Sequence, residues 1–403
     1  MSAPSSACPA HAPRPSYAAV LRVPYARRTF AAALAGRLSY GMVSPAVMLA
    51  VVRATGSYAV AGTIMALFGG AGVFLMPLRA ALVDRHGPRR ALLPMATLYG
   101  GLLCVLAAVT WRPGAPVVAL GAVATLTGAC APPLGPTMRS VWAELVGERG
   151  MLQRAYSLDG VAEELLYVVG PLAVGAVLSC APPAAGVLLS ATLIGAGTFA
   201  FVTSPALAGV RVPSGGRRRA GRAGGRGLLG PVVVAVGMGL ALSAVYLLVM
   251  AFAEQRGYGD GAVPWVLAAL SAGSAVGGLL NGAVDWRTAA RVRLAVSAVG
   301  LGLVLAAAGL ASGLWSLAVA VACAGVFVAP ALTTAYLLAD EAAAPGARTQ
   351  AGAWVNTGVN AGSSCGSVAA GLLIGRLPLG VCFVVAGVVA VAAGVVVAVV
   401  RRR

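Results

Sequence analysis

Three ionisable side chains lie in stretches of sequence that otherwise hold mostly apolar and small residues. Glu163 and Glu164 occur within "GVAEELLYVVGPLAVG", and Arg37 occurs within "FAAALAGRLSYGMV". A charge in apolar surroundings is costly unless it is paired or faces a water-filled cavity. These three residues, together with the neighbouring Tyr167, are therefore candidates to bind a substrate or to carry a proton.

Each of these residues also has a structural interpretation. The glutamates begin about 8 Å into the expected helix by helix rise, so with Asp159 they can instead stabilise the dipole at a helix N-terminus. Adjacent helix positions point about 100° apart, so Glu163 and Glu164 cannot line one surface equally. Arg37 can pair with one of these carboxylates, bind an anionic substrate or extend to the membrane interface. We favour a functional role for Arg37 and leave both interpretations open for the glutamates.

The elements that position these residues are predicted by composition, because 59% of the 403 residues are hydrophobic and only 10% are charged. A helix needs about 20 apolar residues to cross the hydrocarbon layer of a bilayer. The ten-residue alternating segments of membrane β-barrels are absent. We therefore predict an all-α integral membrane protein with twelve transmembrane helices. Their expected ranges are 30–52, 58–80, 91–111, 115–138, 158–180, 183–203, 231–253, 262–284, 292–312, 314–338, 350–374 and 379–399.

The distribution of arginine predicts the topology. All 29 basic residues are arginine, and short segments rich in arginine stay on the cytoplasmic side of a membrane. With both termini inside, 24 arginines, among them Arg79 and Arg139, fall in cytoplasmic segments, four fall outside and Arg37 lies within the first span. We expect a multi-pass protein of the plasma or inner membrane with both termini cytoplasmic. This topology explains the net charge of +18 without nucleic-acid binding.

The sequence also divides into two halves. Residues 204–230, "SPALAGVRVPSGGRRRAGRAGGRGLLG", predict a flexible cytoplasmic linker between a six-helix bundle over 30–203 and a second over 231–403 with a short basic tail. Residues 1–29 predict a mobile cytoplasmic tail. Asp84 matches Asp285, residues 128–133 match 325–330, and residues 155–161 match 353–359, at offsets of 201, 197 and 198 residues. Matches in this order favour a duplicated unit whose copies share one orientation.

Charged residues gather between the second and third expected spans. The residues are Ala80, Asp84, Arg85, Gly87, Arg89 and Arg90, and they resemble the loop motif Gly-x-x-x-Asp-Arg-x-Gly-Arg-Arg of the major facilitator superfamily. Ala80 replaces the first glycine, Pro88 precedes the arginine pair, and Asp285 with Arg287 forms a degenerate copy. The resemblance implies a transporter whose halves rock about a central cavity and expose one site alternately to the two sides.

The position of this motif predicts a conformational latch. Asp84 lies where a span meets the cytoplasm, so it can face a helix N-terminus or an arginine of the other half. Such a contact contributes about 0.3 to 2 kcal/mol, which biases a near-balanced equilibrium. We assign the latch to Asp84, Arg85, Gly87, Arg89, Arg90 and Asp285. In the alternative interpretation, the arginines set topology alone.

Gly170 and Pro171 resemble the core of the motif Gly-x8-Gly-Pro-x-x-Gly-Gly, which is found in the drug:proton antiporter branch of this superfamily. Gly160 stands ten positions before Gly170, and Gly175 comes one position late, so the flanks depart from the motif. Pro133 and Pro330, at matching positions of the two halves, predict kinks in the fourth and tenth spans. The resemblance implies export.

Other functional classes are disfavoured. Gly362, Ser364 and Gly366 satisfy Gly-x-Ser-x-Gly inside an apolar span, where a hydrolase nucleophile does not occur. The chain has no lysine, so it has no Walker-type ATP site, and its seven cysteines show no Cys-x-x-Cys spacing. We expect no enzymatic activity, no cofactor and no metal site.

The sequence therefore predicts a secondary active transporter that works by alternating access and exports a small, partly apolar organic molecule in exchange for protons. Its expected partners are the lipid bilayer, the substrate and protons, and we expect a monomer. The alternatives are proton-linked uptake of a metabolite and a non-transporting membrane receptor or assembly protein on the same fold. Amides within the spans are scarce, which favours export of a partly apolar molecule. They are Asn281, Asn356 and Asn360.

Overall fold

The computed structural model describes residues 16–208, 225–258 and 261–399, and these form helices without strands. The first bundle consists of α2 (Ala26–Thr55), α3 (Tyr58–His86), α4 (Pro88–Thr110), α5 (Val117–Cys130), α6 (Leu134–Leu145), α7 (Arg149–Leu178) and α8 (Pro183–Val202). The second consists of α10 (Gly225–Gln255), α11 (Ala262–Ala283), α12 (Ala290–Ala308), α13 (Leu314–Gly325), α14 (Val328–Ala342), α15 (Arg348–Leu373) and α16 (Leu379–Val399).

The helices confirm the predicted fold class. Eleven segments of the described chain are long and apolar enough to cross a membrane, with α5–α6 and α13–α14 each counted as one. The 26-residue α15 supplies the one remaining predicted span, 350–374, although its asparagine, serine and threonine residues make it less apolar. Each predicted window coincides with one helix or one broken helix.

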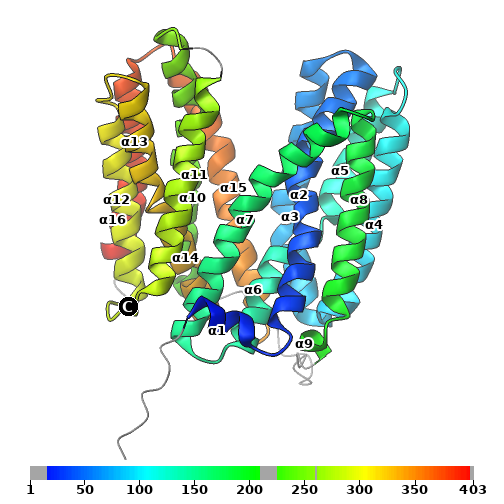
Figure 1. Cartoon of the computed structure of the whole chain (residues 1–403), viewed down its shortest axis with the longest axis horizontal. Helices are drawn as coiled ribbons and strands as arrows, with labels where there is room; N and C mark the ends of the chain where they lie inside the picture. Colours follow the sequence, from blue (N-terminus) through cyan, green and yellow to red (C-terminus); the bar gives the residue numbers. More distant parts are fainter. Residues whose placement is uncertain (1–15, 209–224, 259–260, 400–403) are drawn as a thin grey trace, which may run out of the picture.

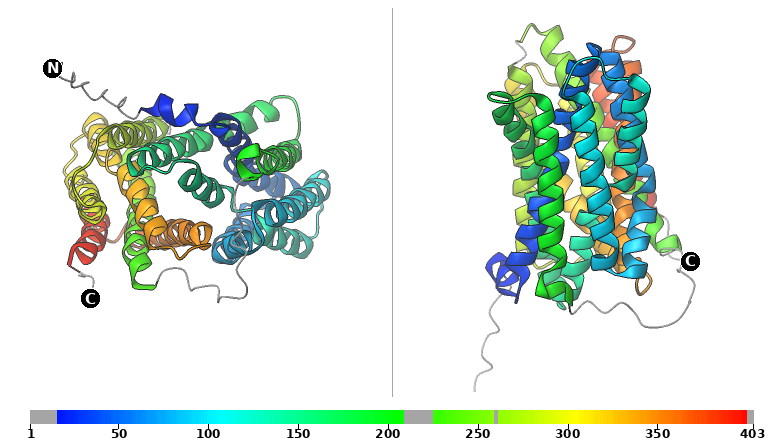
Figure 2. Two further views of the ribbon diagram at one scale, coloured as in Figure 1. Left: turned by 90° about the horizontal axis from the view of Figure 1, so that it is seen from below. Right: turned by 90° about the vertical axis from the view of Figure 1, so that its right-hand side faces the viewer.

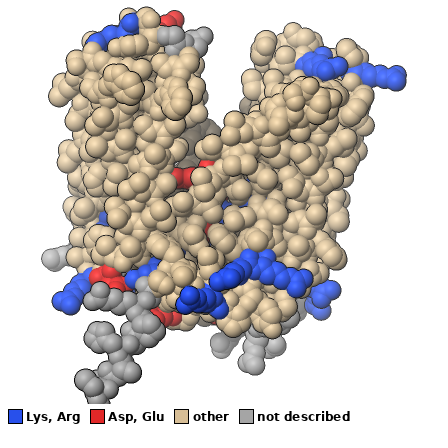
Figure 3. All heavy atoms as spheres, viewed as in Figure 1, with Lys and Arg blue, Asp and Glu red and all other residues tan. Residues whose placement is uncertain are grey.

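The two bundles stand side by side, touch at one end and diverge at the other (Figure 1, Figure 2). At the closed end, α7 packs on α11 and α14, while α3 and α6 pack on α15. A hollow opens between the bundles at the other end, and most described arginines gather at the closed end (Figure 3). That this end faces the cytoplasm stays a prediction.

Both prolines that predict a kink, Pro133 and Pro330, lie at or next to a break between two helices. The chain leaves the helix over 131–133 between α5 and α6, because neither Pro132 nor Pro133 has an N–H to continue the hydrogen-bond ladder. The chain also leaves the helix at 326–327, between α13 and α14. Pro330 follows within the first turn of α14, and the first turn of a helix tolerates proline. Each broken span therefore consists of two shorter helices rather than one bent one.

Three boundaries differ from expectation. Part of the expected N-terminal tail forms α1 (Tyr17–Arg22), whose Tyr17 hydroxyl donates to the carbonyl of Leu279 on α11 at 2.6 Å. The ends of the expected linker are helical, as α9 (Pro205–Ala208) and the start of α10, while residues 1–15, 209–224 and 400–403 of the expected tails and linker lie outside the described residues. Helix α7 begins at Arg149, nine residues before the expected 158, so Asp159 lies well inside the helix.

The crossing of α2 and α7 depends on two glycines. A Cβ atom on Gly170 would lie 2.4 Å from the carbonyl carbon of Gly41, so the two backbones are in direct contact. Pro171 follows within α7 without ending the helix. Gly175, one turn further along, has no heavy atom within 4 Å of its added Cβ. Gly170 is therefore required for the close approach of α2 and α7, and small residues have this role in many membrane helix bundles.

Candidate functional site

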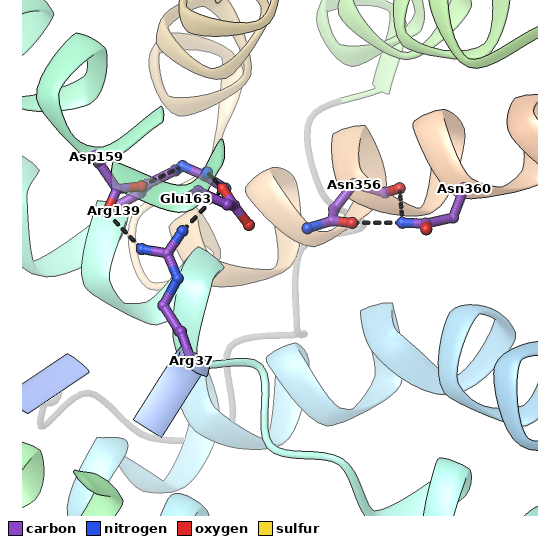
Figure 4. Close-up of polar contacts among 6 residues, drawn as sticks. All are labelled: Arg37, Arg139, Asp159, Glu163, Asn356 and Asn360. Atoms are coloured by element: carbon purple, nitrogen blue, oxygen red, sulfur yellow. Dashed lines mark hydrogen bonds and ion pairs between the residues drawn. The ribbon is translucent and has the colours of Figure 1, made fainter. Parts of the chain in front are cut away.

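A cavity of about 200 Å³ lies between the bundles. Most of its wall comes from the first bundle, and Asn356 and Asn360 of α15 face it from the second (Figure 4). Apolar side chains such as Val43, Phe68 and Met76 form part of the wall. Its polar lining from the first bundle includes Arg37, Tyr40, Arg79, Tyr99, Glu163 and Tyr167.

Two arginines and two carboxylates form a closed network at the base of this cavity (Figure 4). Arg37 donates to Asp159 at 2.6 Å and pairs with Glu163 at 2.8 Å. Arg139 pairs with Asp159 at 3.0 Å and also with Glu163. The four charges cancel. Glu163 is the most exposed member of the network, at 24% of its side chain, and both Glu163 and Arg37 line the cavity.

Helix geometry explains this arrangement. Asp159 and Glu163 are four residues apart on α7, so both carboxylates lie on the face that meets α2 and α6. Arg139 reaches them because α6 starts again after the proline break and continues to Leu145. Its guanidinium also lies 3.8 Å from the ring centroid of Tyr336 on α14, so the network contacts the second bundle.

The structure corrects three expectations about these charges. Arg139 and Arg79, expected in cytoplasmic segments, are each only 4% exposed and lie within helices, so Arg37 is not the only buried arginine. Asp159, which lies near a helix N-terminus in the structural interpretation, is fully buried ten residues into α7. The spacing of four between Asp159 and Glu163 was the available sequence signal for this pair.

Arg79 binds the broken end of α5. Its guanidinium donates to the carbonyls of Gly128 and Ala129 at 2.6 and 2.7 Å, and to Gly72 at 2.5 Å. Neither of the first two carbonyls has its usual partner four residues on, because positions 132 and 133 are prolines without an N–H. The carbonyl of Gly128 keeps one 3.4 Å bond from the N–H of Ala131 at the end of α5. Tyr40 donates its hydroxyl to the carbonyl of Pro132 at the same break. No carboxylate of the described residues pairs with Arg79.

Glu164 has different surroundings from Glu163. It turns toward the second bundle, where one carboxylate oxygen accepts a hydrogen bond from the hydroxyl of Ser274 on α11. Its other oxygen is buried and has no hydrogen-bond partner among the described residues. No described arginine forms an ion pair with it. Tyr167, one turn after Glu163, lines the cavity with the network.

Asp84 contacts the second bundle at the closed end. Its two carboxylate oxygens accept from the backbone N–H groups of Thr349 and Gln350 at 3.1 and 2.8 Å, at the N-terminus of α15. Gly87, with φ of 84°, ends α3 and allows the turn into α4, while Arg85, Arg89 and Arg90 are exposed. In the matching position, Asp285 pairs with Arg154 of α7 at 2.7 Å. The latch function of these contacts stays a prediction.

We expect Asp84→Ala to shift the protein toward a conformation open at this end. Loss of a helix cap costs about 0.5 to 2 kcal/mol, which changes the ratio of the two conformations about 2- to 30-fold. Distance distributions between spin labels at 86 and 341 measure this shift. Asp340→Ala is the control, because Asp340 pairs with Arg348 inside one bundle. Equal populations in wild type and Asp84→Ala would refute the latch.

The family model described as Major Facilitator Superfamily matches residues 29–305 and 229–403. A search of curated proteins finds no significant match.

Several solved structures share the fold. A bacterial homologue of the iron transporter ferroportin in an outward-facing state has 13% identity and a TM-score of 0.72, over 92% of this chain and 98% of its own. The human organic anion transporter MFSD10 has 14% identity and a TM-score of 0.71, over 93% and 99%. The fucose:proton symporter FucP of E. coli has 14% identity and a TM-score of 0.66, over 96% and 100%. At these identities the likeness concerns the fold.

Proposed function

The chain belongs to the Major Facilitator Superfamily, and from this membership we propose that it is a secondary active transporter that exports a small, partly apolar organic molecule in exchange for protons. It acts as a monomer, since one chain builds the whole cavity. The closed, arginine-rich end faces the cytoplasm of a plasma or inner membrane. The conformation described above is then open to the outside.

One observation carries the proton coupling. Glu164 lies on a transmembrane helix, at the contact between the bundles, with one oxygen on Ser274 and the other without a partner among the described residues. A carboxylate without a cationic partner in such a place carries an uncompensated charge, and binding of a proton removes that charge. Because Ser274 belongs to the other bundle, gain or loss of a proton at Glu164 changes a contact that depends on the relative position of the two bundles.

Glu163 is the weaker candidate for a proton carrier. It is paired with both Arg37 and Arg139, and protonation would break two charge-assisted interactions. Its exposure to the cavity fits a role in orienting the substrate instead, with Arg37 and Tyr167. Two features support export: the apolar side chains in the cavity wall, and the resemblance of Gly170 and Pro171 to the antiporter motif.

The test uses proteoliposomes and matched amphiphilic carboxylates, amides and amines as probes. We expect a proton gradient to drive accumulation of at least one probe by the wild type. We expect Glu164→Gln to abolish this accumulation while exchange of labelled for unlabelled probe persists. Glu254→Gln is the control, because Glu254 is exposed at the end of α10. Gradient-driven accumulation by Glu164→Gln would contradict the proton role, and no movement of any probe would contradict transport.

Proton-linked uptake is the second candidate. The amides of Asn356 and Asn360 face the cavity and are hydrogen-bonded to one another at 2.6 Å, a polar surface that suits hydroxyl and carbonyl groups of a metabolite. Proton movement in the same direction as the probe would favour uptake over export.

A further inference from the structure

The cavity wall combines a surplus of positive charge with unused hydrogen-bond donors. Among the described residues that line it, Arg37 and Arg79 are basic and Glu163 is the one acidic residue. Behind them lie Arg139 and Asp159, each paired into the network. The network is neutral, so Arg79 adds one uncompensated positive charge.

The hydrogen bonds of Arg79 do not remove this charge. Its partners are three backbone carbonyls, which are dipoles without net charge. Its Nε–H has no hydrogen-bond partner among the described residues, although only 4% of the residue is exposed. The hydroxyl of Tyr99, fully buried and on the same wall, also has no partner there. A buried donor without an acceptor is costly.

Part of the wall beside these polar groups is apolar. Phe68, Val73 and Met76 line the cavity from α3, the helix that carries Arg79. A molecule bound here contacts apolar side chains along its body. One of its ends faces the Nε–H of Arg79, the hydroxyl of Tyr99 and the positive charge of Arg79. Acceptor groups of an anion satisfy both donors and the charge together, whereas an ammonium group satisfies none of them.

On the proposed function, we infer that the transported molecule is a small organic anion, with its anionic group at Arg79 and Tyr99 and its apolar body against α3. Arg79 is then a substrate-binding residue as well as the cap of the broken helix. Glu164, which does not line the cavity, leaves the proton site separate from the anion site. Export of one monoanion for one incoming proton moves two positive charges inward in each cycle.

The test measures binding to the purified full chain in nanodiscs, by tryptophan fluorescence and thermal stabilisation. The probes are matched triplets that share one apolar body and end in a carboxylate, a primary amide or an amine, with bodies from butyl to naphthyl. We expect the carboxylate to bind most tightly in each triplet that binds. Tighter or equal binding of the amide or amine, or no binding by any carboxylate, would overturn the inference.

Two variants test the assigned residue. Arg79→Gln keeps an N–H donor for the carbonyls but removes the charge, and we expect it to weaken carboxylate binding about 10- to 100-fold relative to the amide. Arg79→Lys keeps the charge and is expected to keep the preference. Arg256→Gln is the charge control, because Arg256 is exposed directly after α10 and does not line the cavity. The ratio of two affinities on one variant is insensitive to general loss of packing. An unchanged ratio in Arg79→Gln refutes the assignment.

Failure of this inference differs from failure of the proposed function. Preferred binding of amines with proton-driven transport intact would overturn the anion alone. Preferred binding of carboxylates with no proton movement in proteoliposomes would overturn the proton coupling alone. Movement of the anion and the proton in the same direction would support the anion and favour uptake over export.

Discussion

Replacing Arg37 with methionine is expected to lower the free energy of unfolding by about 3 to 5 kcal/mol. The substitution leaves the buried carboxylates of Asp159 and Glu163 with Arg139 as their one cationic partner, and so leaves one net negative charge at the base of the cavity. Removing one member of a buried ion pair costs more than the pair contributes, because the remaining charge is no longer compensated.

Unfolding in mixed micelles titrated with a denaturing detergent measures this loss. The double variant Arg37→Met with Asp159→Asn restores neutrality, since one arginine and one glutamate remain. We expect the two changes to cost at least about 1 kcal/mol less together than the sum of the single costs. The control is Arg90→Met at an exposed position, expected within about 0.5 kcal/mol of the wild type. Additive costs would show that the network is not coupled.

Substitution of Gly170 by alanine is expected to destabilise the protein by about 1 to 3 kcal/mol or to prevent folding. The added methyl group would enter the backbone of Gly41, and rigid helix backbones cannot yield as a flexible side chain does. Gly175→Ala in the same helix is the matched control, because its added methyl meets open space. Thermal unfolding in detergent compares the two. Equal midpoints would show that α2 and α7 do not require close contact.

Much of the fold could be predicted because the bilayer imposes a simple requirement on the chain. Every segment long and apolar enough to cross forms a helix, and the polar α15 was still recognisable by its length and small residues. The start of α7 could not be predicted by hydropathy, since its first turns include Arg149, Gln153 and Arg154. These residues are helical because they pack on the second bundle at the closed end, and such a contact is invisible to a window of sequence.

The site was predictable only in part. Arg37, Glu163, Glu164 and Tyr167 were identifiable because charges and hydroxyls stand out in apolar stretches. Arg79 and Arg139 were hidden, since an arginine near the end of a span resembles any interfacial arginine. Their burial depends on the proline break between α5 and α6, which exposes carbonyls to Arg79 and turns Arg139 toward Asp159.

Reciprocal movement of the two ends of the molecule tests the central claim of alternating access most directly. Spin labels at 118 and 315 lie on opposite bundles at the open end, on exposed side chains of α5 and α13, and labels at 86 and 341 span the closed end. We predict that conditions that shorten the 118–315 distance, such as a bound carboxylate probe or a change of pH, lengthen the 86–341 distance in the same population. Distances that stay fixed under all these conditions, or that shorten at both ends together, would contradict the account.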